Sequence, residues 1–270
     1  MINLQKLEEK YRDAGYSEQN ANARVCQDIV LKAIAESNLG RNVTIKGGVV
    51  MRSITGNVRR ATEDLDIDFI KYSLEDESIR CFISKLNCLE GISIKIKDNK
   101  IEQLSQQEYR GKRVYIIIKD NDGNVIESKI DLGVHTNMKI EQDTYCFDIC
   151  MDDEGASLLI NSCEQIFAEK LRSLLRFGPL STRYKDIFDL CYLKDYVDML
   201  RLVECIKAYI IDEPSMREKD MKDIHKRVAV TLSNRQFRRS VERSGERNWL
   251  QIEVGVAFEM IQDFLESVEL

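Results

Sequence analysis

Two hydrophobic periodicities divide the chain into two halves. Between residues 41 and 150, apolar and polar side chains alternate in several short runs, which predicts β-strands because successive side chains of a strand point to opposite faces. From about residue 161, apolar side chains recur every three or four positions, which predicts amphipathic helices. We therefore expect an α+β protein, with a mixed-sheet core over residues 1–155 and an all-helical half over residues 156–270.

Individual elements follow from the same patterns. Two helices are expected over residues 1–40, and Ser17 is a good N-cap for the second. The segment "VTIKGGVVMRSITG" predicts a short strand, a Gly-Gly turn and a helix. Strands are expected over residues 63–70, 92–98, 112–120 and 126–135, with a helix over 74–88. The segments "NSCEQIFAEKLRSLLRFG", "RYKDIFDLCYLKDYV" and "DMLRLVECIKAYII" predict helices, and a last amphipathic helix closes the chain.

Composition narrows the class of protein. The 270 residues include 43% hydrophobic and 32% charged side chains, as in an ordinary globular protein, and the net charge of −6 argues against a general polyanion-binding protein. We expect no membrane span and no signal peptide, and hence a cytoplasmic protein. The 8 cysteines include no C-x-x-C pair, which favours buried reduced thiols. With 2 histidines in the chain, any chemistry must rest on carboxylates, lysines and backbone groups.

The segment "RRATEDLDIDF" places several acids on one face of a predicted strand. Asp64, Asp66 and Asp68 alternate with apolar residues that would pack on a core. Taken alone, the segment is explained equally well by an edge strand whose outer face is acidic for solubility. A site for hard divalent cations, which prefer oxygen ligands, is the other interpretation.

Two further segments bring candidate groups towards this strand. Gly47 and Gly48 let the backbone turn sharply before a helix whose free N–H groups favour phosphate, although a plain turn also explains them. In "ESKIDLGVH", Asp131 lies opposite the packed face of its strand. It is either a solvated strand position or a third carboxylate that converges with Asp64 and Asp66 on Mg²⁺.

The helical half contributes charged residues at positions close to apolar stripes. Lys170 lies on or beside the stripe of "CEQIFAEKLRSLL", where it needs an anionic partner or must extend its ammonium to water. In "RYKDIFDLCYL", Asp186 and Asp189 share one side of a helix, with Arg183 one turn earlier. A structural ion pair and a catalytic role are both open for these acids.

Taken in order, these motifs resemble a known family. Gly-Gly, R-x-[ST]-x-D-L-D, an aspartate strand, A-E-K-L and R-x-K-D-x-x-D-L follow one another over about residues 45–190. This order looks like the AbiEii/AbiGii nucleotidyltransferases, relatives of the MenT toxins in the polymerase-β-like superfamily. The last two motifs are as informative as the first, because the superfamily at large does not share them. The resemblance does not reach residues 1–40 or those after about 200.

The resemblance implies roles for the matching positions. Gly47 and Gly48 would form the turn that binds the nucleotide phosphates, and Thr62 would supply the hydroxyl position near it. Asp64 and Asp66 would be catalytic residues that bind Mg²⁺ or Mn²⁺.

The remaining matches concern Lys170, Asp186, Asp131 and Asp68. The resemblance makes Lys170 and Asp186 catalytic residues, and Lys170 would also contact the nucleotide. Asp131 matches the third metal-binding carboxylate of the superfamily, whereas Asp68 lies outside the pattern and is not expected to be a metal ligand.

The function implied by the resemblance is that of a metal-dependent nucleotidyltransferase, the toxin of a bacterial toxin–antitoxin or phage-defence system. It would transfer nucleotides from an NTP to an RNA acceptor, in characterised relatives the 3′ end of tRNA, and a cognate antitoxin would be a further partner. Transfer to a protein or small-molecule hydroxyl, and a non-catalytic binding module of the same fold, are the alternatives. No base-reading motif indicates which NTP is used.

One local pattern concerns the acceptor. Between Arg217 and Arg247, ten Lys and Arg stand against five Asp and Glu, a net charge of +5 inside a chain of −6. Within it, "RQFRRSVER" predicts a helix with a basic face formed by Arg235, Arg238, Arg239 and Arg243. This is either a solvated helix that pairs with acids of the remaining chain or a platform for an RNA backbone.

Overall fold

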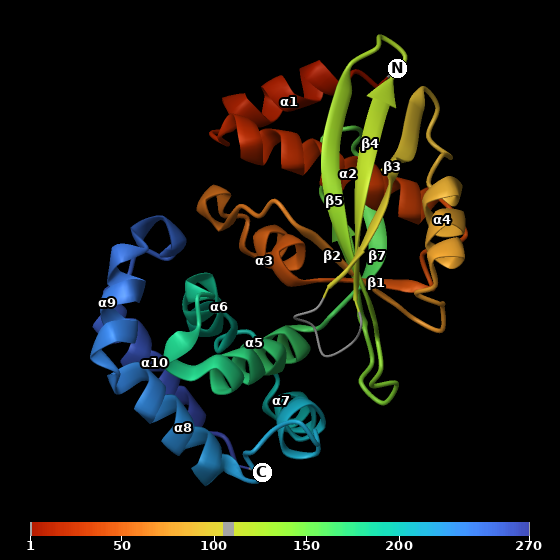
Figure 1. Cartoon of the computed structure of the whole chain (residues 1–270). Helices are drawn as coiled ribbons and strands as arrows, with labels where there is room; N and C mark the ends of the chain where they lie inside the picture. Colours follow the sequence, from red (N-terminus) through yellow and green to blue (C-terminus); the bar gives the residue numbers. More distant parts are fainter. Residues whose placement is uncertain (1, 105–110, 270) are drawn as a thin grey trace. The chain divides into compact units, whose positions relative to one another are not determined.

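A seven-stranded mixed sheet organises the first part of the chain (Figure 1). The computed structural model describes residues 2–104 and 111–269, which fall into two compact units, Met1–Asn161 and Ser162–Leu270. The strands are β1 (Val43–Lys46), β2 (Leu65–Phe69), β3 (Ile92–Gln103), β4 (Lys112–Asp120), β5 (Val125–Val134), β6 (Asp143–Phe147) and β7 (Ala156–Ile160). Their order is β3-β4-β5-β2-β1-β7-β6, with β2–β5 and β1–β7 parallel and the other pairs antiparallel. The predicted α+β class with a mixed sheet is confirmed.

The helices of this unit begin and end at recognisable residues. They are α1 (Leu4–Asp13), α2 (Glu18–Glu36), α3 (Gly47–Thr55) and α4 (Asp76–Lys85), with a 3₁₀ turn η1 at Val58–Arg60. The Ser17 side chain accepts a hydrogen bond from the Asn20 N–H, so the predicted N-cap of α2 is confirmed. Gly56, with a φ of +60°, ends α3 in the left-handed conformation that glycine adopts without strain.

The alternation of side chains along the strands fixes which face of the sheet is packed. Leu65, Ile67 and Phe69 of β2 are all buried. Phe69 packs edge to face against Phe82 of α4, with ring centroids 5.0 Å apart, so α4 covers this apolar face. Asp64, Asp66 and Asp68 therefore point to the other side.

The structure differs from the expected elements at one end of the sheet and at its central strand β2. Strands β6 and β7 were not expected, and residues 156–160, which we placed in the helical half, form β7 beside β1. Both strands are short, and "ASLLI" has too little polar alternation to be distinguished from a helix by periodicity. The aspartate strand is also shorter than expected, so Asp64 lies just before β2 rather than inside it.

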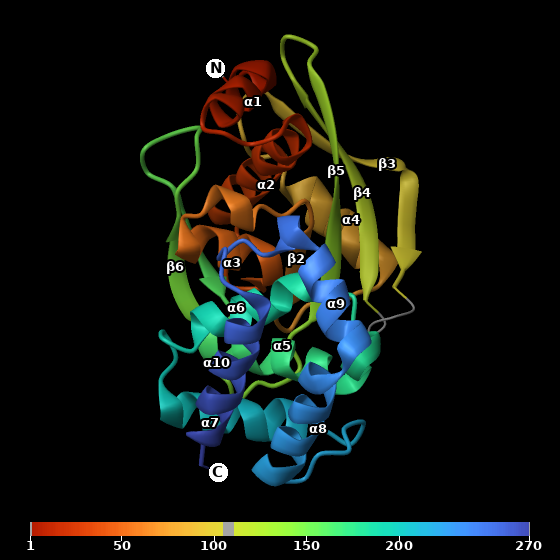
Figure 2. The same ribbon diagram turned by 90° about the vertical axis from the view of Figure 1, so that its left-hand side faces the viewer.

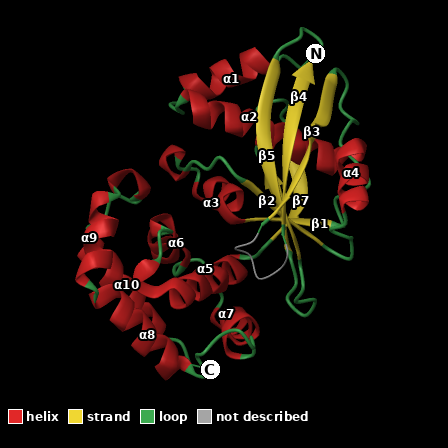
Figure 3. Ribbon diagram, in the orientation of Figure 1, coloured by secondary structure: helices red, strands yellow, loops and turns green. Residues whose placement is uncertain are grey.

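The second unit is helical in all its regular elements that the structure describes (Figure 3). Its α-helices are α5 (Cys163–Phe177), α6 (Tyr184–Leu193), α7 (Met199–Ile206), α8 (Met221–Ser233), α9 (Arg235–Arg243) and α10 (Val254–Glu266). Shorter turns are η2 (Gly178–Leu180), η3 (Lys207–Ile211) and η4 (Gly245–Arg247). Helix α10 contacts α6, α8 and α9 (Figure 2), and Ser162 and Gln165 form a capping box that begins α5.

Within the part of the chain that the structure describes, the helices of the protein are too short or too polar to cross a membrane.

Candidate active site

The junction between β1 and α3 brings two predicted groups of residues together. Gly47 and Gly48 are the first residues of α3, and Gly47 has a φ of +66°. A Cβ atom on Gly47 would lie 2.4 Å from Oδ2 of Asp66, and one on Gly48 would lie 2.4 Å from Oγ1 of Thr62. Only glycine allows this close approach, so the N-terminus of α3 lies directly against Asp66 and Thr62.

The predicted carboxylates gather on adjacent strands. Asp66 of β2 pairs in register with Asp131 of β5 and with Lys46 of β1. Asp64 precedes Asp66 by two residues and points to the same side of the sheet. The structure therefore groups Asp64, Asp66 and Asp131 with the glycine turn, as the sequence predicted.

Three of the acids in this region have a basic partner that sequence reasoning missed. Lys129 Nζ lies 2.8 Å from Asp64 Oδ1, and Lys46 Nζ lies 2.7 Å from Asp68 Oδ1, in both cases without the alignment of a hydrogen bond. Arg113 of β4 donates two hydrogen bonds to Asp131, each of 2.7 Å. These basic partners could have been found only from the register of the paired strands, which the sequence alone did not supply.

Asp66 has the most unusual environment of these acids. Burial raises the pKa of its carboxyl to about 6, and the nearby Asp131, Asp64 and Asp68 carboxylates add to this rise against the opposing charge of Lys46. A carboxyl whose charge is disfavoured by burial and by like charges gains from a bound cation.

The fit of a divalent metal to this region is partial. Among the described residues, no group of three or more His, Cys, Asp and Glu is already arranged to hold a metal ion. Asp64 and Asp66 offer carboxylate oxygens, the ligands that Mg²⁺ and Mn²⁺ prefer, and the crowding of negative charge at Asp66 suits a cation. Asp131 accepts a hydrogen bond from Arg113 on each of its oxygens, so Arg113 already neutralises the charge of this predicted ligand.

Gln27 supports this region, although no sequence motif singled it out. Its side chain is fully buried on α2, and Nε2 donates to the carbonyl oxygens of Thr62 (2.9 Å) and Asp64 (3.4 Å). Its Oε1 accepts a hydrogen bond from the buried Arg52 of α3. One side chain therefore ties α2 both to α3 and to the segment before β2. The sequence did offer one indication of this role, a polar glutamine within a mostly apolar stretch of the predicted helix.

In the helical unit, the structure groups Lys170 with two acids. Lys170 Nζ lies 2.6 Å from Asp186 Oδ1 and 2.7 Å from Asp189 Oδ2. Asp189 is 0% exposed and also accepts a 2.9 Å hydrogen bond from the Trp249 indole N–H. Lys170 thus has the anionic partner that its position beside an apolar stripe required, and that partner includes Asp186. Asp189, which we had not included in the site, completes the cluster.

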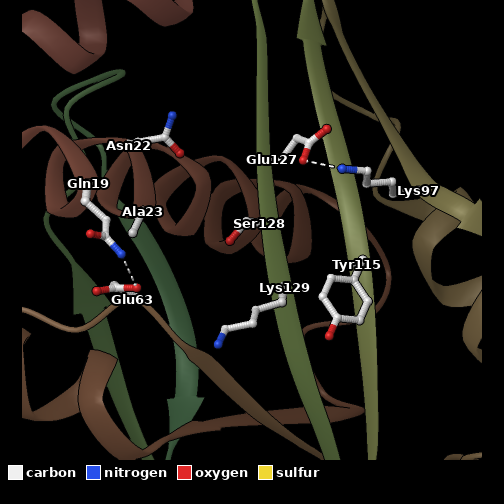
Figure 4. A pocket seen from close by; sticks show the side chains of 9 residues that line it. All are labelled: Gln19, Asn22, Ala23, Glu63, Lys97, Tyr115, Glu127, Ser128 and Lys129. Carbon is white, nitrogen blue, oxygen red and sulfur yellow. Dashed lines mark hydrogen bonds and ion pairs between the residues drawn. The ribbon is translucent and has the colours of Figure 1, made fainter. Parts of the chain in front are cut away.

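A pocket of about 280 Å³ lies in the first unit next to Asp64 (Figure 4). Its lining residues come from α2, the segment before β2, and strands β3, β4 and β5: Gln19, Asn22, Ala23, Glu63, Lys97, Tyr115, Glu127, Ser128 and Lys129. Lys129 is also the partner of Asp64, and Glu63 is the residue before Asp64. The pocket therefore adjoins the candidate metal site, with Lys129 between them.

The predicted basic helix exists as α9, but its arginines divide into two kinds. Arg238 lies over the Phe258 ring, 5.2 Å from the centroid. Arg235, Arg239 and Arg243 are exposed, and none has a hydrogen bond or ion pair with the described residues of its unit. They recur at every fourth position and so form one stripe along the helix.

Comparison with known proteins identifies the family. No curated protein was found to match the chain. The crystal structure of an antigenic nucleotidyltransferase-like protein from Paracoccidioides brasiliensis is similar, with a TM-score of 0.46 and 14% sequence identity over 87% of this chain and 97% of that chain. A family model described as "Nucleotidyl transferase AbiEii toxin, Type IV TA system" matches residues 29–252, further in both directions than the motifs alone suggested. The match covers most of the chain and confirms the expected resemblance: the chain belongs to the AbiEii nucleotidyl transferase toxin family of type IV toxin–antitoxin systems.

Proposed function

We propose that this protein transfers a nucleotide from an NTP to a hydroxyl group of an RNA acceptor, the 3′ end of a tRNA, with Mg²⁺ or Mn²⁺ as cofactor. The observation that carries the proposal is the contact between the N-terminus of α3 and the acids of β2, where a Cβ on Gly47 would meet Asp66 at 2.4 Å. Backbone N–H groups at a helix N-terminus bind phosphate, and paired aspartates bind divalent cations. A nucleoside triphosphate complexed with metal needs both groups in one place.

The residues of the first unit have separate tasks in this reaction. Gly47 and Gly48 place backbone N–H groups at the triphosphate, and the Thr62 hydroxyl lies beside them. Asp64 and Asp66 would hold the metal, which supplies charge neutralisation at the phosphates and lowers the pKa of the attacking hydroxyl. The acceptor oxygen forms a bond to the α-phosphorus as the bond to the β-phosphate oxygen breaks. Pyrophosphate leaves with that electron pair, and the hydroxyl proton passes to a carboxylate of the site.

Lys170 and Asp186 take part in the same reaction under this proposal. Lys170 is only 9% exposed and is held by two carboxylates, which orient its ammonium group. An oriented ammonium stabilises negative charge that develops on a leaving pyrophosphate. We expect Lys170→Arg to be inactive, because a planar guanidinium does not fit the place of a compact ammonium between Asp186 and Asp189.

The acceptor is bound in part by the exposed stripe of α9. Arg235, Arg239 and Arg243 are exposed and have no partner in the described part of the helical unit, which leaves their guanidinium groups accessible to a ligand and supports this part of the proposal. Exposed arginines contact phosphates through two hydrogen bonds and stack on unpaired bases. A single-stranded 3′ end offers both groups.

The biological role follows the family. As a member of a type IV toxin–antitoxin family, the protein has a cognate antitoxin as its genetic partner. We propose that it acts in the cytoplasm, where NTPs and tRNA are found, and that its activity arrests growth as part of phage defence.

The test is transfer of label from each of the four NTPs, labelled at the α-phosphate, to total RNA, total protein or small molecules, separated on gels. Wild-type protein should label an RNA band of tRNA size in the presence of Mg²⁺. The variants Asp64→Ala, Asp66→Ala and Lys170→Ala should each reduce labelling by at least about 10²-fold, the usual cost of removing a group that stabilises the transition state. Label in the protein or small-molecule fraction would replace RNA as the acceptor, and no label in any fraction would contradict transferase activity.

A further inference from the structure

The pocket beside Asp64 exists because β2 is short. Strand β2 pairs with residues 130–134 of β5, whereas β4 pairs along residues 125–132. Residues 127–129 of β5 therefore have no strand on their β2 side within the described chain. The start of α2 and Glu63 lie there instead and enclose the pocket with β5 (Figure 4).

The pocket lies on the side of Asp64 away from the glycine turn. Thr62 points to Gly48, whereas the next residue, Glu63, lines the pocket. Lys129, the partner of Asp64, forms the wall between the acid and the pocket. Phosphates bound at the glycine turn and a ligand in the pocket would thus approach Asp64 from different sides.

The chemistry of the walls fits a neutral, hydrogen-bonding, flat ligand. Two lysines and two glutamates line the pocket, so their charges balance, and the Gln19 and Asn22 amides offer donors and acceptors. The Tyr115 ring is held on its strand by a 2.9 Å hydrogen bond from its hydroxyl to Glu102 and by Lys100, whose ammonium lies 4.1 Å from the ring centroid. A fixed aromatic ring on one wall of a pocket and amide groups on another can bind a nucleobase by stacking and edge contacts.

We propose that this pocket binds the nucleoside that carries the attacking hydroxyl, the 3′-terminal nucleoside of the acceptor. The proposal rests on the function proposed above. In nucleotidyl transfer, the attacking and leaving oxygens lie roughly in line on opposite sides of the phosphorus. If pyrophosphate leaves on the side of the glycine turn, the acceptor hydroxyl must arrive from the other side of Asp64, where the pocket lies.

The experiment compares binding of two versions of the RNA that the labelling assay identifies. One version has its normal 3′-terminal nucleoside and the other has an abasic ribose there, and affinity is measured by fluorescence anisotropy without NTP. Wild-type protein should bind the normal RNA about tenfold more tightly, because stacking of one base contributes that much or more. Asn22→Phe, which fills the pocket, and Gln19→Ala, which removes an amide from its wall, should each reduce this ratio towards one. Asn20→Phe, on the same helix but outside the pocket, is the matched control and should keep it.

The kinetic constants separate this proposal from its competitors. The two pocket variants should raise KM for the acceptor and leave KM for the NTP within about twofold, a change that a merely structural defect would not confine to one substrate. A rise in KM for the NTP alone would give the pocket to the incoming nucleotide and overturn the proposal. Equal binding of both RNAs by a wild type that labels RNA would overturn the pocket assignment alone, whereas absence of RNA labelling would overturn the proposed function.

Discussion

At the scale of single residues, the half-buried carboxyl of Asp66 makes a prediction about stability. The pKa of the Asp66 carboxyl is raised from 3.8 to about 6 in the folded protein, so the folded state holds this proton more tightly than the unfolded state does. The resulting contribution to the free energy of unfolding is fully present below pH 3.8 and is lost as the pH rises through 6. Without metal at pH 8, Asp66→Asn should therefore be more stable than wild type by about 2–3 kcal/mol, and the difference should vanish near pH 4. Urea unfolding in EDTA across this pH range measures it.

Magnesium provides the control for Asp66. At pH 8, added Mg²⁺ should raise the unfolding midpoint of wild-type protein and leave that of Asp66→Asn nearly unchanged, because a ligand stabilises only the state that binds it. An Asp66→Asn protein that is less stable than wild type at pH 8 without metal would contradict the assignment of Asp66 to a strained, metal-binding position.

Gln27 leads to a second prediction at this scale. Gln27→Leu leaves the Thr62 and Asp64 carbonyls without this donor and Arg52 without an acceptor, which should cost about 1–3 kcal/mol of stability. It should also weaken Mn²⁺ binding, measured by calorimetry, because the segment that carries Asp64 loses its support. Ile29→Ala, fully buried on the same helix, should lower stability and leave the Mn²⁺ affinity unchanged. Equal Mn²⁺ affinities of the Gln27 variant and wild type would show that Gln27 serves the fold alone.

Residue identity predicted some members of the site better than others. Gly47, Gly48, Thr62, Asp64 and Asp66 came from motifs, and the structure places them together because strand, turn and strand follow one another closely along the chain. Their assigned roles stay predictions.

The partners of these residues could not be predicted in the same way. Lys129 and Arg113 meet their acids only through the pairing of strands β2, β4 and β5. Trp249 meets Asp189 across sixty residues of chain. Such contacts depend on register and packing, which periodicity does not encode.

At the scale of elements, the start of α3 is the most constrained feature. Gly47→Ala would place a methyl group against Oδ2 of Asp66 at a left-handed position, so Asp66 must shift. We expect a loss of transferase activity of about 10²-fold, since a displacement of about 1 Å at a reacting centre has that effect. Gly56→Ala is the matched control, because Gly56 has a similar φ of +60° and open space around it. It should lose about 1 kcal/mol of stability and retain activity, which assays at matched folded fractions will show.

Helix α9 supplies the prediction about the acceptor. Since Arg238 is engaged with Phe258, the informative change is Arg239→Glu with Arg243→Glu. Loss of two phosphate contacts should weaken RNA binding by at least about tenfold and reduce the salt slope of the affinity by about 1.4, with KM for the NTP unchanged. Lys222→Glu with Lys226→Glu makes the same change of charge on exposed positions of α8 and should have a smaller effect. If the two double variants lose RNA affinity equally, net charge rather than the α9 stripe binds the acceptor.

Long periodic elements were the ones that the sequence predicted well. Helices α2, α5 and α10 and strands β4 and β5 lie where hydrophobic patterns placed them, because each buries a continuous face. Strand β7 was missed because it is only five residues long and one of its two less buried positions carries the apolar Leu159, so its sequence does not alternate as its burial does.

At the scale of the whole molecule, each unit has its own core of buried apolar side chains, which do not need a metal ion to pack. Chelation with EDTA should therefore abolish transferase activity while the far-UV circular dichroism and the cooperativity of urea unfolding persist. Zinc-dependent small domains behave in the opposite way and unfold when metal is removed. Restored activity on addition of Mg²⁺ completes the test, and unfolding on chelation would assign the metal a structural role.

The basic side chains beside Asp64, Asp68 and Asp131 allow the protein to fold before it binds a metal ion. A newly synthesised chain can bring these acids together without waiting for metal, because Lys129, Lys46 and Arg113 neutralise them as the sheet forms. Maturation and activation are then separate in time. Under the proposed function, a metal ion that binds Asp64 would have to displace the Lys129 ammonium, so folding would not depend on the metal whereas activity would.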